Sequence, residues 1–160
     1  MASITANISK GRAVEFYENV NSNNPANSAL IIGVLVTGGD TLLTLQDYDT
    51  VAAMLAGPST EAAATGYARK TLTDADLASW SPDDTNNRIL LTLPLQTWTP
   101  NTGETWDIAF VAYDNDTTGG TDANLIPITY HEMRENGTAM PTITGSSIVL
   151  DLSAGWTLSV

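Results

Sequence analysis

Short segments in which apolar and polar residues alternate, with turn residues between them, limit the fold of this chain more than any other feature. A period of two residues is that of a strand with one buried face, whereas a helix repeats every 3.6 residues. We therefore expect a mainly β fold, an antiparallel β-sandwich or barrel-like domain of about seven to nine strands with about one or two short helices. At 160 residues the chain has the size of one domain, and we predict a single β-rich domain over residues 1–160.

The clearest alternation runs over residues 89–98. Leu91, Leu93 and Leu95 fall on one face of this segment, which is the pattern of a half-buried strand. Pro94 interrupts the segment, and proline has no N–H to donate to a strand ladder. We therefore expect the strand to lie at a sheet edge or to bulge at Pro94.

A second alternating segment covers residues 105–113. It puts Trp106 on the same face as Ile108 and Phe110, so we expect Trp106 to lie in the core. Residues 101–103 between the two segments have the composition of a turn. This spacing predicts that the two segments form a hairpin in one sheet.

The other segments have weaker patterns. Residues 29–36 form a continuous apolar run, which predicts a strand covered on both faces. Residues 12–20 fit a strand by alternation or a helix by their apolar stripe, and we favour the strand. Residues 49–56 are expected to form a helix capped by Asp49, and residues 74–78 a single turn capped by Thr73. Further strands are expected over residues 126–130, 148–152 and 156–160, and core positions at Ile32, Val34, Leu91, Leu93, Ile108, Phe110, Ile128 and Leu150.

Charge and composition exclude several classes of function. The chain has 18 acidic and 6 basic residues, a formal net charge of -12. Nucleic acids and anionic membranes are bound by Lys and Arg, so we expect neither as a partner. Without cysteine there is no disulfide, zinc–thiolate site or thiol nucleophile. The first residues do not resemble a secretory signal, and no apolar run is long enough for a membrane helix, so we expect a soluble protein made in a cytoplasm.

His131 is the only histidine, so a Ser-His-acid triad would have to use it. No Gly-x-Ser-x-Gly sequence accompanies it, and no second histidine follows Glu132 at the spacing of a helical zinc motif. We expect an ordinary loop histidine. We predict no catalytic, cofactor-binding or metal-binding residues, and no cofactor.

The stretch that begins at Asp114 opens like a calcium loop. Oxygen ligands at its first and third positions and glycine at its sixth suit a hard cation and a sharp turn. The pattern then fails, because Thr118 stands at the fifth position and Leu125 stands where a bidentate glutamate is needed. A non-helical calcium site of Asp114, Asp116 and Asp122 is the alternative. We expect a solvated turn that requires no metal.

Paired acids and tryptophans are the remaining candidates. Paired carboxylates can serve as acid and base in glycoside hydrolysis, and helix caps or solvated loops also explain them. The pairs are Asp47 with Asp49, Asp74 with Asp76, and Asp83 with Asp84. Four tryptophans could form a platform on which sugars stack, but tryptophan is also common core material. Trp98 fits either role.

Six short stretches of sequence, all before about residue 135, are informative when taken together. They are residues 10–17, 24–31, 47–51, 66–73, 83–88 and 113–122. In this order they resemble a family of small virion proteins of tailed bacteriophages. None of the stretches is a catalytic motif, so the resemblance concerns family membership and identifies no site. The residues after Met140 contribute nothing to it.

The resemblance implies a structural, non-enzymatic role as a head decoration (cement) protein. Such a protein binds the outer surface of the major capsid protein shell and stabilises it, as a homo-oligomer, at the virion surface after synthesis in the host cytoplasm. The alternatives are a tail or fibre component, a carbohydrate-binding adhesin module, and a hydrolase that uses paired acids. An exposed Trp or Tyr platform would favour the adhesin, and a cleft with two facing carboxylates would favour the hydrolase.

Overall fold

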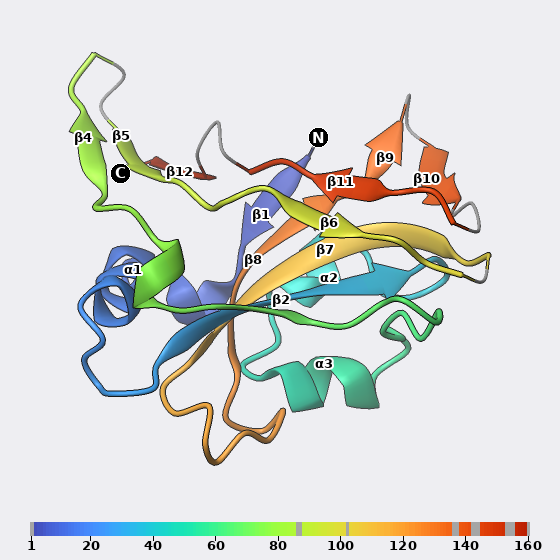
Figure 1. The fold of residues 1–160 in the computed structure, drawn as a ribbon, viewed down its shortest axis with the longest axis horizontal. Coiled ribbons are helices and arrows are strands. Elements are labelled where there is room, and N and C mark those ends of the chain that lie inside the picture. The colour runs from blue at the N-terminus through green and yellow to red at the C-terminus, as the bar shows by residue number, and fades with distance from the viewer. Residues whose placement is uncertain are drawn as a thin grey trace.

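The main sheet of the computed structural model is built around two long antiparallel strands (Figure 1). Its strands are β1 (Ser3–Thr5), β2 (Ala29–Val36), β3 (Lys70–Leu72), β7 (Thr105–Asp114), β8 (Ile126–Glu132), β9 (Arg134–Glu135) and β10 (Thr138–Pro141). β7 pairs with β2 on one side and with β8 on the other, and β3 and β1 follow at the edges. β10 pairs with the first residues of β7, and β9 pairs with β10. The structure describes residues 2–85, 88–101, 103–135, 138–141, 145–152 and 156–159.

A second β layer covers one face of the main sheet. It consists of the pair β6 (Gln96–Trp98) and β11 (Ile148–Leu150) and of the sheet β4 (Ser81–Asp83), β5 (Arg88–Leu91) and β12 (Trp156–Ser159). Helix α1 (Ala13–Asn21) packs on this face too, whereas α2 (Leu42–Leu45) and α3 (Val51–Ala56) cover the opposite face (Figure 1). Two 3₁₀ turns are η1 (Asn7–Ser9) and η2 (Asp74–Asp76).

The expectation of a mainly antiparallel, sandwich-like β fold is confirmed. The described residues contain twelve strands, several of only two to four residues, and three short α-helices, which is more of each than expected. The strands expected near the C-terminus are β8, β11 and β12, although residue 160 lies outside the described residues. The residues predicted for the core are all buried: Ile32, Val34, Leu91, Leu93, Ile108, Phe110, Ile128 and Leu150.

β2 is covered on both faces, as predicted. Its even-numbered side chains, with Ile32 among them, pack under the second β layer, and its odd-numbered ones, with Ile31 among them, pack against α2 and α3. At Gly33 the ring of Phe110 crosses the strand so closely that any side chain would collide with it. A central strand buried on both faces therefore separates two hydrophobic cores.

Helix α1 occupies residues 13–21, so the strand predicted over residues 12–20 is wrong. The buried side chains of α1 are Ala13, Phe16, Tyr17 and Val20, the stripe of the helical alternative. Phe16 fits both the two-residue period of a strand and the 3.6-residue period of a helix, which is why the sequence was ambiguous. The hydroxyl of Tyr17 lies 2.8 Å from the carbonyl oxygens of Ala78 and Thr92 and joins the helix to the second layer.

The segment predicted as one strand over residues 89–98 is two strands. β5 ends at Leu91, β6 begins at Gln96, and Pro94 lies in the break between them. Leu93 is buried, but Leu95 is 52% exposed and Gln96 is buried instead. The inward-facing positions thus shift by one residue at the proline. The break agrees with the expected interruption at Pro94, but the single apolar face over residues 89–95 is wrong for Leu95.

β6 and β7 do not form the predicted hairpin. β6 pairs with β11, whereas β7 pairs with β2, β8 and β10. The connection after Pro100 therefore joins two layers, and residue 102 of the predicted turn lies outside the described residues. A register shift between β2 and β7 beside Asp107 also moves Trp106 into the core opposite to that of Ile108 and Phe110. Trp106 is buried as predicted, but on the other face of the sheet.

The two predicted helix caps have different outcomes. Thr50, not Asp49, caps α3, because its Oγ1 accepts a hydrogen bond of 3.1 Å from the N–H of Ala53. Thr73 caps η2 as predicted, and Asp76 completes a capping box by accepting from the N–H of Thr73 at 2.9 Å. None of the described helices has the length and apolar character that crossing a membrane requires.

Candidate functional site

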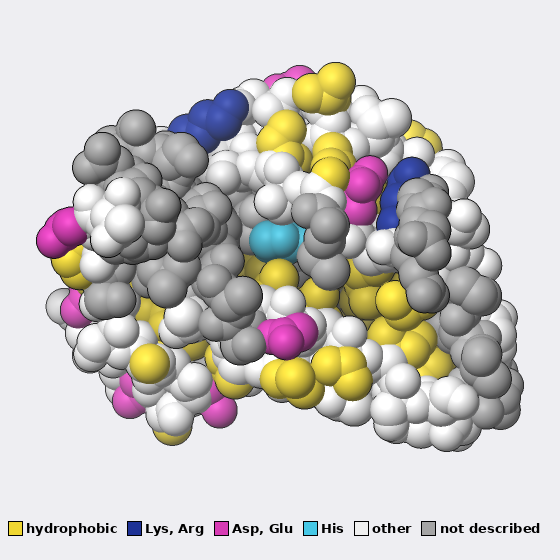
Figure 2. Space-filling view, turned by 90° about the horizontal axis from the view of Figure 1, so that it is seen from above, with side chains coloured by type: hydrophobic (Ala, Val, Ile, Leu, Met, Phe, Trp, Pro, Cys, Tyr) yellow, Lys and Arg dark blue, Asp and Glu magenta, His cyan; other side chains and the backbone are white. Residues whose placement is uncertain are grey.

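His131 lies in β8, so the expectation of a loop histidine is wrong. It stands opposite Ser3 of β1 and Ala109 of β7, and it is only 4% exposed. Its Nε2 is buried and has no hydrogen-bond partner among the described residues. Burial lowers the pKa of the imidazole to about 4. Figure 2 shows the small part of the imidazole that reaches the surface, in cyan. No described hydroxyl or carboxylate completes a triad with its Nε2.

The three candidate calcium ligands in and after β7 each have a partner within the protein. Asp114 is buried and accepts a hydrogen bond of 3.0 Å from the N–H of Asp116. Asp116 in turn accepts from the N–H and hydroxyl of Thr118, which lowers the pKa of its carboxyl group. Asp122 is bound by Arg69. In the described part of the chain, no three His, Asp or Glu side chains gather as a metal site would require. The buried Asp114 also departs from the fully solvated turn that the sequence predicted.

Asp114 and Asp122 do line one small cavity, of about 140 Å³, together with Arg69. Its volume is below the roughly 300–1,000 Å³ of small-molecule sites. Because the guanidinium of Arg69 already binds both oxygens of Asp122, the two carboxylates are not a free acid–base pair.

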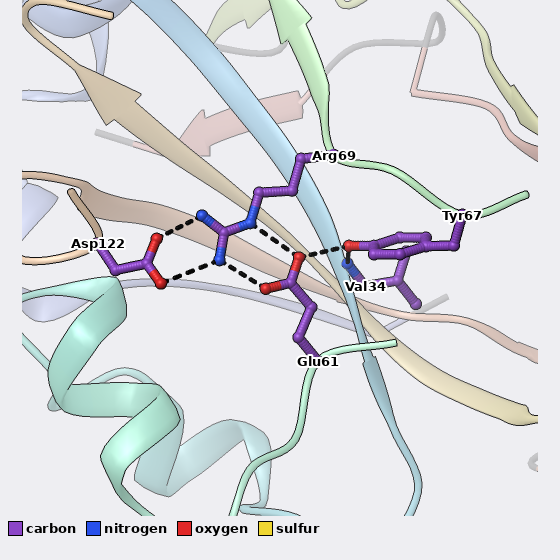
Figure 3. A network of polar contacts seen from close by, with 5 residues as sticks. All are labelled: Val34, Glu61, Tyr67, Arg69 and Asp122. Carbon is purple, nitrogen blue, oxygen red and sulfur yellow. Dashed lines mark hydrogen bonds and ion pairs between the residues drawn. The ribbon is translucent and has the colours of Figure 1, made fainter. Parts of the chain in front are cut away.

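Arg69 is the centre of a polar network that the sequence did not reveal (Figure 3). Its guanidinium donates to both oxygens of Glu61, at 2.8 Å from Nε and 2.5 Å from Nη2. It also donates to both oxygens of Asp122, at 2.5 Å from Nη1 and 3.3 Å from Nη2. The hydrogen bonds with Glu61 and then Asp122 raise the pKa of Arg69 above its already high value. The network fastens the segment before β3 to the loop between β7 and β8.

Tyr67 extends this network to the main sheet (Figure 3). Its hydroxyl donates to Oε1 of Glu61 at 2.6 Å and accepts from the N–H of Val34 in β2 at 2.9 Å. Burial, and then the hydrogen bond with Glu61, raise the pKa of Tyr67, so the hydroxyl remains a neutral donor. We call Glu61, Tyr67, Arg69 and Asp122 the Arg69 network.

Trp98 and Trp106 lie in the core and form no surface platform. Their rings meet edge to face with centroids 5.8 Å apart. The indole N–H of Trp98 donates to the carbonyl oxygen of Ala68, and that of Trp106 donates to Glu104. Trp80 is partly exposed in the segment before β4, and the side chain of Trp156 lies outside the described residues. The pair flanking the predicted turn therefore offers no stacking surface for a sugar.

The paired acids that suggested a hydrolase have local roles where the structure describes them. Asp47 accepts a hydrogen bond of 2.5 Å from Nδ2 of Asn7, and Asp76 caps η2. Asp49, Asp74 and Asp84 are exposed, and the side chain of Asp83 lies outside the described residues. These positions agree with the caps and solvated loops of the simpler interpretation.

The outer face of the β6–β11 pair is an exposed, uncharged surface. Because Gln96, Trp98, Ile148 and Leu150 point inward, the side chains between them point to solvent. We define the outer face as Leu95, Thr97, Thr99, Ser147 and Val149. Thr97 stands directly opposite Val149, which is 48% exposed, and the hydroxyls of Thr99 and Ser147 lie 3.4 Å apart. None of these five residues is charged, but the exposed Asp151 directly follows β11 and continues the alternation of Ser147 and Val149.

No family model, curated protein or solved structure matches this chain. Sequence reasoning missed both the Arg69 network and the outer face. The network joins residues that are 8 and 53 positions apart, so no local pattern could indicate it. The alternation of Leu95, Thr97 and Thr99 was visible, but without the shift at Pro94 Leu95 was placed on the same face as the buried Leu91 and Leu93.

Proposed function

We propose that this protein is a non-enzymatic structural protein of a tailed-bacteriophage virion. It acts as a decoration (cement) protein that binds the outer surface of the major capsid protein shell and stabilises it. The virion context rests on the resemblance of the stretches over residues 10–122. The observation that carries a binding role is the outer face, where exposed Leu95 and Val149 lie among Thr and Ser. Burying such a surface removes apolar area from water without desolvating an ion.

The positions of the chemically capable groups support a role without catalysis. His131 is buried and neutral above about pH 4, and Arg69 and Asp122 are engaged with each other. The ion pair of Arg69 and Asp122 joins the segment before β3 to the loop between β7 and β8. A rigid body with a preformed contact surface is what binding to an assembled shell needs, because little ordering entropy is then lost on binding.

We further propose that several copies act together on the shell. The outer face is a strip of only five side chains, and a stable protein interface buries roughly 1,200–2,000 Å² in total. A homo-oligomer placed on the symmetry of the capsid would add such weak contacts together. The partner is the major capsid protein at the virion surface, after synthesis of this protein in the host cytoplasm, and neither nucleic acid nor a membrane is involved.

Binding to isolated phage heads tests the proposal. Heads are prepared from particles that lack this protein, mixed with the purified protein and sedimented. We expect Leu95→Asp and Val149→Asp to weaken binding at least about tenfold, because each places a carboxylate in the contact. Leu43→Asp is the matched control, since Leu43 is 69% exposed on α2 at the opposite face of the main sheet.

Two results would contradict the proposal. If the wild-type protein does not sediment with the heads, the decoration role is wrong. If the outer-face variants bind like wild type while Leu43→Asp does not bind, the contact surface is on the α2 side instead. The amide NMR spectrum of each variant shows whether it retains the wild-type fold.

A further inference from the structure

A pocket of about 540 Å³ opens beside α1, within the roughly 300–1,000 Å³ of small-molecule sites. It lies between α1, the loop over residues 22–28 and the loop between β7 and β8. We call it the α1 pocket. Its polar lining residues are Arg12, Asn19, Tyr113, Asn115 and Asn124, and its apolar ones are Phe16, Pro25 and Ile126.

The two loops that form the walls of the α1 pocket are tied to each other and to the fold. The N–H of Thr117 donates to the carbonyl oxygen of Asn27 at 3.0 Å and so joins one loop to the other. The first two N–H groups of α3 donate to the carbonyl oxygens of Leu125 and Asp122, at 3.0 and 2.9 Å. The walls are therefore held in place before a ligand arrives, which reduces the entropy lost on binding.

Stacked aromatic rings form the base of the pocket. The rings of Phe16 and Tyr113 lie nearly parallel, with centroids 4.6 Å apart. The guanidinium of Arg12 covers Phe16 at 4.6 Å from the ring centroid. Both rings are largely buried, so they shape the base and leave recognition to the groups above them.

The side-chain amides around this base are not used by the fold. Asn115 and Asn124 are exposed, and their side chains hydrogen-bond to no described residue. Asn19 makes only a long contact, with its Nδ2 3.5 Å from the hydroxyl of Tyr113. Each amide offers a donor and an acceptor side by side. Three such groups around one pocket can therefore satisfy ligand groups that both donate and accept.

The charges at the pocket argue against an ionic ligand. Among the described residues, Arg12 is the only charged one that lines the pocket, and both oxygens of Glu15 already accept from its guanidinium, at 3.0 and 3.1 Å. An anion would approach a chain with a net charge of -12, and a cation would find no carboxylate among the described lining residues. The ligand that fits is therefore neutral.

We propose that the α1 pocket binds a neutral carbohydrate. Sugar hydroxyls donate and accept hydrogen bonds, which matches the amides of Asn19, Asn115 and Asn124, while the C–H faces of a sugar ring can pack on Pro25 and Ile126. This site differs from the tryptophan platform considered from the sequence. It also does not rest on the role at the phage head, because it lies beside α1 and not on the outer face.

Titration followed by ¹H–¹⁵N NMR tests this site directly. The probes are N-acetylglucosamine, glucose and galactose at millimolar concentration, with inorganic phosphate as the charged comparison. We expect at least one of these sugars to shift the side-chain amide signals of Asn115 and Asn124 saturably, and phosphate to leave them unchanged. The double variant Asn115→Ala, Asn124→Ala should bind about tenfold more weakly. Asn101→Ala, which removes an exposed amide elsewhere, should bind like wild type.

Three results would overturn the proposal. They are no saturable shift with any of the three sugars, a shift with phosphate alone, or an equal loss of affinity in Asn101→Ala. If the amide spectrum shows that the double variant does not fold, the single variant Asn124→Ala replaces it, and wild-type affinity in that variant would also contradict the assignment.

Discussion

The Arg69 network and the outer face of the β6–β11 pair use polar and apolar groups in opposite ways. In the network one guanidinium is shared by two carboxylates, and Tyr67 links them to β2. On the outer face no residue is charged, and two aliphatic side chains are about half exposed. In the Arg69 network the polar groups already hydrogen-bond to one another, whereas the outer face still has exposed apolar area that a partner could cover.

This difference separates what holds the fold together from what is available for binding. The Arg69 network lies where three distant segments meet, so its contacts determine how the loops are placed. The outer face belongs to a layer whose inward side chains already pack, so its outward side chains are not needed for the fold. Substitutions in the Arg69 network should therefore change stability, and substitutions on the outer face should change binding. Substitutions in the core beneath the outer face should change both.

Removing the packing beneath the second layer should have the largest effect. Leu93→Ala should lower the free energy of unfolding by about 2–5 kcal/mol, because Leu93 is fully buried in the core under that layer. Head binding should weaken with it, since the outer face depends on the same layer. Urea unfolding measures the change, with the neighbouring Leu95→Ala expected to stay within about 0.5 kcal/mol of wild type. A cost below about 1 kcal/mol for Leu93→Ala would mean that this layer is not packed as described.

Acid should destabilise the protein through His131. Its pKa is about 4 in the folded state and near the ordinary 6.5 in the unfolded chain, so the unfolded chain binds more protons between these values. Stability should therefore fall as the pH decreases from about 6.5 to 4, by on the order of 3 kcal/mol from this group. Unfolding of wild type and His131→Leu across this range isolates the contribution. Parallel pH profiles for the two proteins would contradict the burial of a neutral imidazole.

Breaking the Arg69 network should have an intermediate effect on stability. Arg69→Met leaves Glu61 and Asp122 without their cation, and we expect a loss of about 2 kcal/mol because the arginine side chain is only 26% exposed. Adding Asp122→Asn should cost less in the variant than in wild type, since the two residues act together. Arg12→Met, at an exposed ion pair, is the control and should unfold like wild type. Head binding by folded Arg69→Met should be unchanged, and its loss would mean that the network belongs to the contact.

Salt should have the smallest effect on binding to heads. The five residues of the outer face are uncharged and Asp151 is the charged residue directly after β11, so screening at a Debye length of about 8 Å should change the affinity less than about twofold between low and physiological salt. Sedimentation across a salt series measures this. A steep loss of binding would instead show that acidic residues of the protein pair with a basic patch on the shell.

The long central strands were predictable because their burial follows from local pattern. β2 is apolar throughout and lies between two cores, and the alternation in β7 matches its two buried faces except at the register shift beside Asp107. Helix α1 was mispredicted because Phe16 satisfies both the two-residue and the helical period.

The candidate sites were less predictable, since they depend on contacts between distant segments. β6 pairs with β11, about 50 positions later in the chain, so the sequence near the turn after Pro100 could not exclude a hairpin. The shift at Pro94 then decides which residues reach the outer face. Arg69 likewise meets Asp122 only because the loop between β7 and β8 folds back toward it.

Electron microscopy of phage particles assembled without this protein's coding sequence tests the central claim most directly. The proposed role predicts that these heads lack an external density present on wild-type heads and that they tolerate heat and low salt less well. Added wild-type protein should restore the density, whereas Val149→Asp should not and Leu43→Asp should. Heads with unchanged external density and unchanged tolerance would contradict the decoration role, and density missing from the tail would favour the fibre or adhesin alternative.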